Sequence, residues 1–173
     1  TVNIALIDSH QPVFGVVHVP VKDLDYWGVV SGVAAASAGA WRARLRGSVV
    51  EPIRVARPAA HPVRVVGSRS HRGDSLDGFL TRLGAHELVA MGSSLKFCVL
   101  AEGGADVYPR LGPTSEWDTA AAHAVVRGAG GQVVQLDGAA LEYNRRDTWL
   151  NPHFIAYADP DRDWLGLLRG SGA

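Results

Sequence analysis

Asp118 is the residue whose sequence context most favours chemistry. It follows Thr114 and Ser115, which are typical helix-capping residues, and falls in the first turn of a helix predicted over residues 116–131. A carboxylate there is favoured by the helix dipole and by nearby backbone N–H groups, so one interpretation is purely structural. The other is metal binding, because Mg²⁺ prefers oxygen ligands and an ionised carboxylate supplies them at neutral pH.

Three further polar stretches follow predicted strands or precede a predicted helix, which is where α/β folds place their ligands. They are Gly67–His71, Gly92–Cys98 and Tyr108–Arg110. Their hydroxyl and cationic groups suit a dianionic phosphate. Three of the residues also have a plainer interpretation. Lys96 could be a lysine that reaches water, Arg110 a solvated surface arginine, and His71 a histidine in a polar loop. The candidate substrate-binding residues are Ser68, Arg69, Ser70, His71, Ser93, Lys96 and Arg110.

Two other reactive residue types carry no predicted site. His123 lies five residues after Asp118, about 140° further around a helix axis, so the two side chains should not share a face. Cys98 is the single cysteine and lies in an apolar run, so we expect it to be buried. One cysteine excludes an internal disulfide and a multi-cysteine metal site.

The pattern of apolar residues predicts two kinds of architecture. Up to residue 50 it favours antiparallel strands at 1–8, 13–21, 24–30 and 41–50, with a loop over 31–40. Val2, Ile4 and Leu6 share one face of the first strand by alternation. Beyond residue 62 strands alternate with helices, which is typical of an α/β unit. The strands there are 63–67, 87–91, 105–108, 132–136 and 154–157 with a short edge at 141–143, and the helices are 76–83, about 95–103 (capped by Ser93 and Ser94), 116–131 and 161–168.

The helix over 116–131 has an apolar face made mostly of small residues, which would let it lie close to a sheet or another helix. Trp117 is expected to pack on this face and to fix Asp118. Glycines at the end of the helix accept the left-handed conformation of a helix stop. The residues of the face are Trp117, Ala120, Ala121, Ala124, Val125 and Gly128.

Three prolines mark residues 51–62 as a stiff connection between two units. We therefore expect residues 1–50 to be the remainder of an N-terminal antiparallel-sheet domain. Residues 63–173 would form a C-terminal α/β domain that carries the substrate-binding loops.

The composition excludes several classes of partner. Lys plus Arg and Asp plus Glu number 17 each, so no net charge favours a nucleic acid polymer or a membrane surface. There is no apolar run of about 18 residues, so no transmembrane segment is expected, and there is no signal-peptide pattern. We expect a cytoplasmic protein, with peripheral attachment to the cytoplasmic face of the inner membrane left open.

The stretch Trp117–Ala121, followed by Gly128–Gly131, resembles the second signature of the inositol monophosphatase superfamily. Further stretches look like its CysQ branch, the 3'(2'),5'-bisphosphate nucleotidases, and the resemblance runs from residue 1 to about 157. It implies a layered α/β/α/β/α sandwich, here the C-terminal α/β unit plus part of the N-terminal antiparallel sheet. These further stretches are Thr1–Asp8, Gly67–His71, Gly92–Cys98, Tyr108–Arg110 and Asn151–Phe154.

The resemblance also implies an activity. It is that of a magnesium-dependent, lithium-sensitive phosphatase, which converts 3'-phosphoadenosine 5'-phosphate to AMP and phosphate during sulfate assimilation. By motif, Asp118 would be a metal ligand that also touches the substrate phosphate. The remaining implied contacts are Ser93 and Lys96 around the phosphate and adenosine, Ser68, Arg69, Ser70 and His71 near the 5'-phosphate, and Arg110 on that phosphate or the base.

In that family a Glu-Glu pair and an Asp-Pro-x-Asp-Gly-Thr motif precede the strand that begins here at Thr1, and neither occurs in residues 1–173. They supply most metal ligands and the groups that activate water. We therefore expect the chain to be about the last two thirds of an enzyme, to need an upstream segment as partner, and to be a poor catalyst alone. The alternatives are an inositol monophosphatase proper and an inactive nucleotide-binding remnant.

Overall fold

The computed structural model describes residues 1–30, 38–67 and 74–169. Its first sheet is antiparallel, with its strands in sequence order. The antiparallel strands predicted at 1–8, 13–21 and 24–30 are confirmed, and Val2, Ile4 and Leu6 do share one face of the first strand, which is exposed. The five strands are β1 (Val2–Asp8), β2 (Gln11–Val19), β3 (Leu24–Val29), β4 (Gly39–Arg44) and β5 (Val50–Pro52).

The hairpin between β1 and β2 is tighter than predicted. Ser9 and His10 alone form the turn, with φ values of 49° and 66°, so β2 already begins at Gln11. Two-residue turns with positive φ match the twist of antiparallel strands. The predicted strand also ends earlier, because Pro20–Lys22 forms a 3₁₀ turn.

The loop predicted over 31–40 and the connection predicted over 51–62 are both partly structured. Residues 31–37 lie outside the described part, whereas Gly39 belongs to β4. The single strand predicted over 41–50 is two strands, and β5 extends into the predicted connection. Ile53 is buried there, and its N–H donates to the carbonyl of Ala40 at 2.9 Å. The division into two domains stays a prediction.

The second sheet is mixed and follows the order β7-β6-β8-β10-β9. The strand β6 pairs in parallel with β7 and β8, while β10 is antiparallel to β8 and β9. The alternation of strands and helices predicted beyond residue 62 is confirmed, but 141–143 forms no strand. The strands are β6 (Val63–Gly67), β7 (His86–Ala90), β8 (Val107–Arg110), β9 (Gln132–Gln135) and β10 (Phe154–Tyr157).

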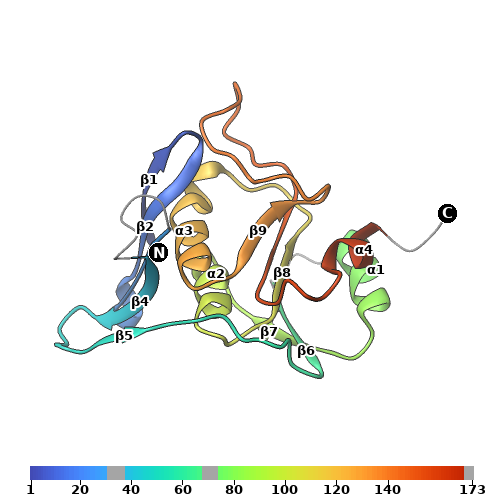
Figure 1. Cartoon of the computed structure of the whole chain (residues 1–173), viewed down its shortest axis with the longest axis horizontal. Coiled ribbons are helices and arrows are strands. Elements are labelled where there is room, and N and C mark those ends of the chain that lie inside the picture. Colours follow the sequence, from blue (N-terminus) through green and yellow to red (C-terminus); the bar gives the residue numbers. More distant parts are fainter. Residues whose placement is uncertain (31–37, 68–73, 170–173) are drawn as a thin grey trace.

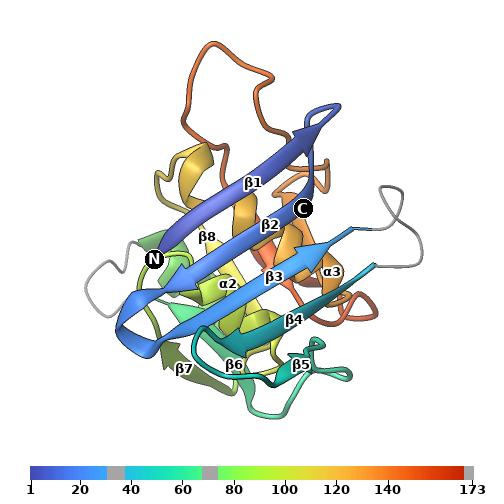
Figure 2. The same ribbon diagram turned by 90° about the vertical axis from the view of Figure 1, so that its left-hand side faces the viewer.

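Four α-helices lie between and beside the sheets. Figure 1 shows α2 and α3 between the two sheets, and α1 and α4 on the far side of the second sheet. The described residues thus form four layers of the predicted sandwich, which confirms the fold class. Figure 2 looks onto the outer face of the first sheet, and none of these four helices lies over it. The helices are α1 (Asp74–Leu83), α2 (Leu95–Ala101), α3 (Ala120–Gly128) and α4 (Trp164–Arg169).

The helix predicted over 116–131 is a 3₁₀ turn, Glu116–Asp118, followed by α3. Thr119 separates the two with a φ of −125°. A 3₁₀ turn has three residues per turn, so side chains before Thr119 do not continue the apolar face of α3. The prediction that Trp117 packs on this face is therefore wrong: Trp117 is 60% exposed, and Glu116 is the buried member of the turn.

The small residues of α3 do bring it close to β2 and β3, as predicted. A Cβ atom added at Gly15 would lie 2.1 Å from the carbonyl oxygen of Ala121, and one at Gly28 would lie 2.5 Å from that of Ala124. Side chains at these two glycines would therefore push the helix away from the sheet. The close contact fixes the position of α3, and with it the 3₁₀ turn that carries Asp118, relative to the first sheet.

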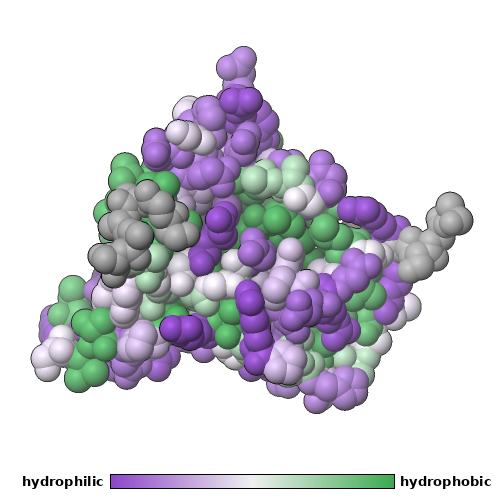
Figure 3. All heavy atoms as spheres, in the orientation of Figure 1, coloured by the Kyte–Doolittle hydropathy of each residue, from purple (hydrophilic) through white to green (hydrophobic). Residues whose placement is uncertain are grey.

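The face of the molecule seen in Figure 3 carries a strongly polar projection. Hydrophilic side chains gather on the loop between β9 and β10, which stands out from the body of the molecule (Figure 3). In the described part of the chain, no helix has the length and apolar character that crossing a lipid bilayer requires.

Candidate functional site

Four predicted site residues, Ser93, Lys96, Arg110 and Asp118, line one pocket of about 240 Å³, which we call the Lys96 pocket. They come from three separate segments: the junction before α2 together with the first turn of that helix, the end of β8, and the 3₁₀ turn before α3. The other residues of its wall are Ser94, Phe97, Tyr108, Thr114 and Thr119. The pocket therefore combines hydroxyl groups, two cations and a carboxylate.

Lys96 is buried, with 7% of its surface exposed. Its Nζ donates to the carbonyl oxygen of Ser93 at 3.3 Å and lies 5.7 Å from the centre of the Tyr108 ring. Burial lowers the pKa of Lys96, and the charge of Arg110 lowers it further, whereas Asp118 opposes the shift. The ammonium group has lost much of its hydration without gaining a salt bridge to a described residue, so an anion in the pocket would stabilise it.

Arg110 presents a second donor. Its Nη2 donates to the carbonyl of Pro113 at 2.6 Å, but its Nε is buried and has no hydrogen-bond partner within the described chain. A buried donor without an acceptor is costly, so the described residues leave the hydrogen-bonding capacity of Arg110 partly unused. Beside it, burial raises the pKa of Tyr108 to about 12, so the phenol is protonated at neutral pH.

Asp118 is exposed and borders the pocket. One of its carboxylate oxygens accepts a hydrogen bond from the backbone N–H of Ser115 at 3.2 Å, which is the capping role that the plainer interpretation gave it. Exposure and the place at the pocket wall leave the carboxylate accessible to a ligand. The two interpretations of Asp118 are thus compatible.

Ser93 and Ser94 do not cap α2 with their side chains, contrary to prediction. The structure shows no capping bond at Ser94, the N-cap residue. Its Oγ donates to Asn3 at 2.8 Å instead, and both serine hydroxyls lie 2.7 Å from the hydroxyl of Thr1. Ser93 has a φ of 53°, an uncommon conformation for a residue with a side chain. These contacts join the junction before α2 to the first strand.

The other predicted substrate-binding residues cannot be placed. Ser68, Arg69, Ser70 and His71 lie outside the residues that the structure describes. Their proposed contact with a 5'-phosphate stays a prediction.

Several pocket residues were not predicted as site residues. Thr114 and Thr119 face the pocket, and their hydroxyls accept hydrogen bonds from the Nδ2 of Asn151 at 3.0 and 3.1 Å. Asn3 contacts the pocket wall from β1. Alternation along β1 could have shown that Asn3 faces the interior side of the sheet, because its side chain must point opposite to those of Val2 and Ile4.

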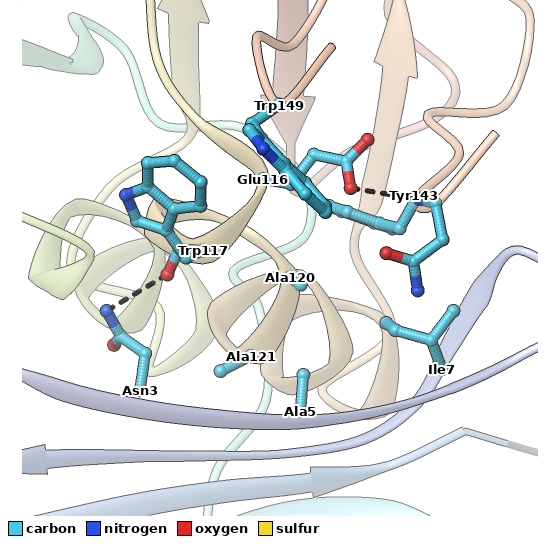
Figure 4. Close-up of a pocket in the computed structure, with 10 residues that line it drawn as sticks. Asn3, Ala5, Ile7, Glu116, Trp117, Ala120, Ala121, Tyr143 and Trp149 are labelled. Carbon is cyan, nitrogen blue, oxygen red and sulfur yellow. Dashed lines mark hydrogen bonds between the residues drawn. The ribbon is translucent and has the colours of Figure 1, made fainter. Parts of the chain in front are cut away.

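A second pocket of about 240 Å³ involves the neighbouring residues of the same 3₁₀ turn, Glu116 and Trp117. Figure 4 shows it between β1 and the start of α3. The Trp117 and Trp149 rings lie 6.1 Å apart at its rim. The buried Glu116 accepts a bond from the N–H of Asn144 at 2.9 Å and lies 3.6 Å from Arg146. These contacts anchor the projecting loop, so we assign Glu116 a structural role.

His123 is fully buried, and its Nδ1 lies 3.0 Å from the hydroxyl of Tyr143. Burial lowers its pKa to about 3, so the imidazole is neutral. It does not line the Lys96 pocket, which agrees with the prediction that it shares no face with Asp118. Cys98 is buried as predicted, and burial raises the pKa of its thiol.

The donor set does not fit a multi-metal site. The described residues hold no group of three or more His, Cys, Asp or Glu side chains placed to bind a metal ion. Among those that line the Lys96 pocket, Asp118 is the one carboxylate. Two metals about 3.5–4 Å apart need several carboxylates to balance their charge. Asp118 by itself does not supply such a set.

The sequence pattern of the inositol monophosphatase family matches residues 1–166. The 3'(2'),5'-bisphosphate nucleotidase CysQ of Salmonella typhimurium is 46% identical over 154 residues, which cover 89% of this chain and 58% of that protein. The Escherichia coli K12 protein of the same name gives the same values. The chain thus spans a little over half the length of these relatives.

Solved structures show the same architecture. The crystal structure of CysQ from Bacteroides thetaiotaomicron, a bacterial member of the inositol monophosphatase family, superposes with a TM-score of 0.77 at 38% identity, covering 90% of this chain and 61% of that one. An inositol monophosphatase from Zymomonas mobilis, at 19% identity and a TM-score of 0.74, shares the fold over 97% of this chain and 62% of its own. Since the family pattern extends over nearly the whole chain and the layered fold is shared with solved members, the chain belongs to the inositol monophosphatase family.

Proposed function

We propose that the chain provides the substrate pocket of a magnesium-dependent phosphomonoesterase, which converts 3'-phosphoadenosine 5'-phosphate to AMP and phosphate in cytoplasmic sulfur assimilation. The observation that carries the proposal is the Lys96 pocket, where Lys96 and Arg110 converge without a salt bridge to any described residue. Relatives of 46% identity that are named bisphosphate nucleotidases support a nucleotide substrate.

In this proposal the residues of the pocket bind and orient the substrate. The Lys96 ammonium and the Arg110 guanidinium donate to phosphate oxygens, since charge-assisted hydrogen bonds are the strong ones. The hydroxyl of Ser93 offers a further donor, whereas the hydroxyl of Thr119 already donates to the carbonyl of Glu116 at 3.1 Å. The protonated Tyr108 remains neutral and forms part of the wall that excludes water.

Asp118 would be the contribution of this chain to magnesium binding. One carboxylate does not hold the metals that this chemistry uses, so the described residues account for binding and orientation but not for the hydrolytic step. In the whole enzyme, Asp118→Asn is expected to lower turnover by orders of magnitude and to weaken the dependence on Mg²⁺.

Two alternatives remain for the same pocket. An inositol monophosphatase would use it for a sugar phosphate, but the relatives of that name are less similar, at 19% identity for the Zymomonas mobilis enzyme. A nucleotide-binding protein without catalysis is favoured by one observation: among the described residues, a single carboxylate lines the pocket.

The proposal is tested by titration calorimetry of the chain with 3'-phosphoadenosine 5'-phosphate and inositol 1-phosphate, together with a phosphate-release assay with and without Mg²⁺. We expect the bisphosphonucleotide to bind more tightly, and Arg110→Gln to weaken it by roughly tenfold or more, as for the loss of a charge-assisted hydrogen bond. Preference for inositol 1-phosphate would support the first alternative. The second alternative would be supported if the nucleotide bound but no phosphate was released, even after a segment corresponding to the rest of the relatives' length was added.

A further inference from the structure

The Lys96 pocket is built from segments that must be held at a fixed separation. Ser93, Ser94 and Lys96 belong to the junction before α2 and to its first turn, whereas Asp118 belongs to the 3₁₀ turn before α3. A phosphate that bridges the two sides needs donors placed to within a fraction of an ångström. Any residue that hydrogen-bonds to both sides would therefore set the geometry of the site.

Asn3 of β1 makes contacts with both sides. Its Oδ1 accepts a hydrogen bond from the hydroxyl of Ser94 at 2.8 Å. Its Nδ2 donates to the backbone carbonyl of Trp117, the residue before Asp118, in a longer bond of 3.5 Å, which is drawn in Figure 4. One side-chain amide thus ties the start of α2 to the turn that carries the carboxylate.

A second contact, from Thr1 just before β1, leads to Lys96. The hydroxyl of Thr1 lies 2.7 Å from the hydroxyls of Ser93 and Ser94. Ser93 is held with a positive φ, and its carbonyl oxygen accepts the hydrogen bond from Lys96 Nζ. Because the position of this carbonyl orients the lysine, displacement of the junction would move the ammonium group out of place.

We propose that Asn3 is a positioning residue for phosphate binding in the Lys96 pocket, acting through Ser94 on one side and through Trp117 and Asp118 on the other. This inference rests on the proposed function for the identity of the ligand. An asparagine suits the role because its amide carries an acceptor and a donor on one short, stiff side chain.

The experiment compares Asn3→Ala and Asn3→Ser with the unsubstituted chain. Titration with 3'-phosphoadenosine 5'-phosphate should show about tenfold weaker binding for Asn3→Ala, the equivalent of two lost hydrogen bonds. Asn3→Ser, whose hydroxyl can reach one partner at most, should lose less. The matched control is Ile4→Thr, on the same strand but exposed on its opposite face, which should bind as the unsubstituted chain does. Equal affinity of all four proteins would overturn the inference while leaving the proposed function intact.

A double-mutant cycle separates positioning from general stability. If Asn3 acts through Ser94, the losses of affinity in Asn3→Ala and Ser94→Ala should not add in the double variant. Additive losses of affinity that run parallel to a fall in the thermal unfolding midpoint would indicate that Asn3 is merely structural. That result would contradict the inference.

A readout without ligand keeps the inference testable if no nucleotide binds. The chain has two lysines, Lys22 and Lys96, so lysine-selective NMR labelling gives two side-chain signals. Asn3→Ala should shift the Lys96 signal and leave that of Lys22, which is exposed on the 3₁₀ turn after β2. An unmoved Lys96 signal would reject the positioning role whatever the ligand. A failure of the unsubstituted chain to bind any phosphate ligand would reject the proposed function instead.

Discussion

Arg64 and Lys96 are two cations with opposite arrangements of partners. Arg64 on β6 donates to Asp106 from its backbone N–H at 2.7 Å, from Nε at 3.1 Å and from Nη2 at 2.8 Å. Its Nη1 donates to the carbonyl of Gly103 at 2.8 Å. Lys96 has the single bond to a backbone carbonyl. The first cation is satisfied by the protein, and the second retains capacity for a ligand.

The pKa shifts of the two groups follow this difference. Hydrogen bonds to Asp106 raise the pKa of Arg64, although burial opposes the shift. Burial and the charge of Arg110 lower the pKa of Lys96. Buried charges that serve the fold are paired, while an unpaired one in a pocket is a candidate functional group. This difference supports a stabilising role for Arg64 and is consistent with the proposed binding role of Lys96.

The largest expected effect comes from breaking the satisfied pair. Asp106 is fully buried, so Asp106→Asn would leave the Arg64 guanidinium without its counter-charge. We expect the free energy of unfolding to fall by about 3 kcal/mol, the lower end of the range for such changes, because the Arg64 side chain is 26% exposed. Urea denaturation measures the loss. Asp161→Asn, at an exposed position away from Arg64, serves as control, and a loss no larger than that of the control would contradict the structural role.

The opposite result is expected at Lys96. Lys96→Met keeps the length and apolar stem of the side chain but removes a poorly solvated charge, so stability should stay the same or rise by up to about 1 kcal/mol. Affinity for 3'-phosphoadenosine 5'-phosphate should fall by roughly tenfold to a hundredfold. Lys22→Met is the matched control for both measurements. If Lys96→Met destabilised the fold as Asp106→Asn does, the contrast would be lost.

A smaller effect should appear in the pH dependence of binding. The Lys96 pKa lies below its ordinary 10.5, so the ammonium loses its proton at a lower pH than an exposed lysine would. Calorimetric titrations should show nucleotide affinity declining on the alkaline side before pH 10.5. In Lys96→Arg the charge persists at that pH, and the decline should disappear. An identical decline in both proteins would assign it to another group.

The smallest effect concerns stability at alkaline pH. Between the lowered folded-state pKa of Lys96 and 10.5, the unfolded chain binds more protons at this site than the folded one. The contribution of Lys96 to the free energy of unfolding should therefore rise with pH through that window. Subtracting the profile of Lys96→Met from that of the unsubstituted chain isolates this contribution. A difference that stays flat or falls with pH would be inconsistent with the burial of this charge.

Much of the fold follows from local sequence patterns. Short apolar runs between turn residues located the strands, and the small residues of α3 predicted its close approach to a sheet, which Gly15 and Gly28 permit. Such features depend on neighbours in the sequence or on regular periodicity, so they can be inferred without coordinates. The gathering of Ser93, Lys96, Arg110 and Asp118 in one pocket agrees with their prediction as one site, although their binding role stays a prediction.

Other features depend on contacts between distant parts of the chain. The helix predicted from Glu116 is interrupted at Thr119, whose hydroxyl bonds to Asn151, 32 residues away. Local periodicity carries no sign of that contact, and for this reason it predicts the wrong surroundings for Trp117. Ser94 has the residue type of a cap, but its hydroxyl bonds to Asn3, 91 positions earlier. Tertiary hydrogen bonds of this kind override local propensity.

The central claim is that Lys96 is kept without a charged partner so that it can bind a phosphate. Lysine-selective NMR during titration with 3'-phosphoadenosine 5'-phosphate tests it most directly, because each of the two lysines gives its own signal. We predict a large, saturable shift of the Lys96 signal and a raised Lys96 pKa in the complex, with Lys22 unchanged. A Lys96 signal that stays in place at saturating nucleotide, or that moves no more than that of Lys22, would contradict the claim.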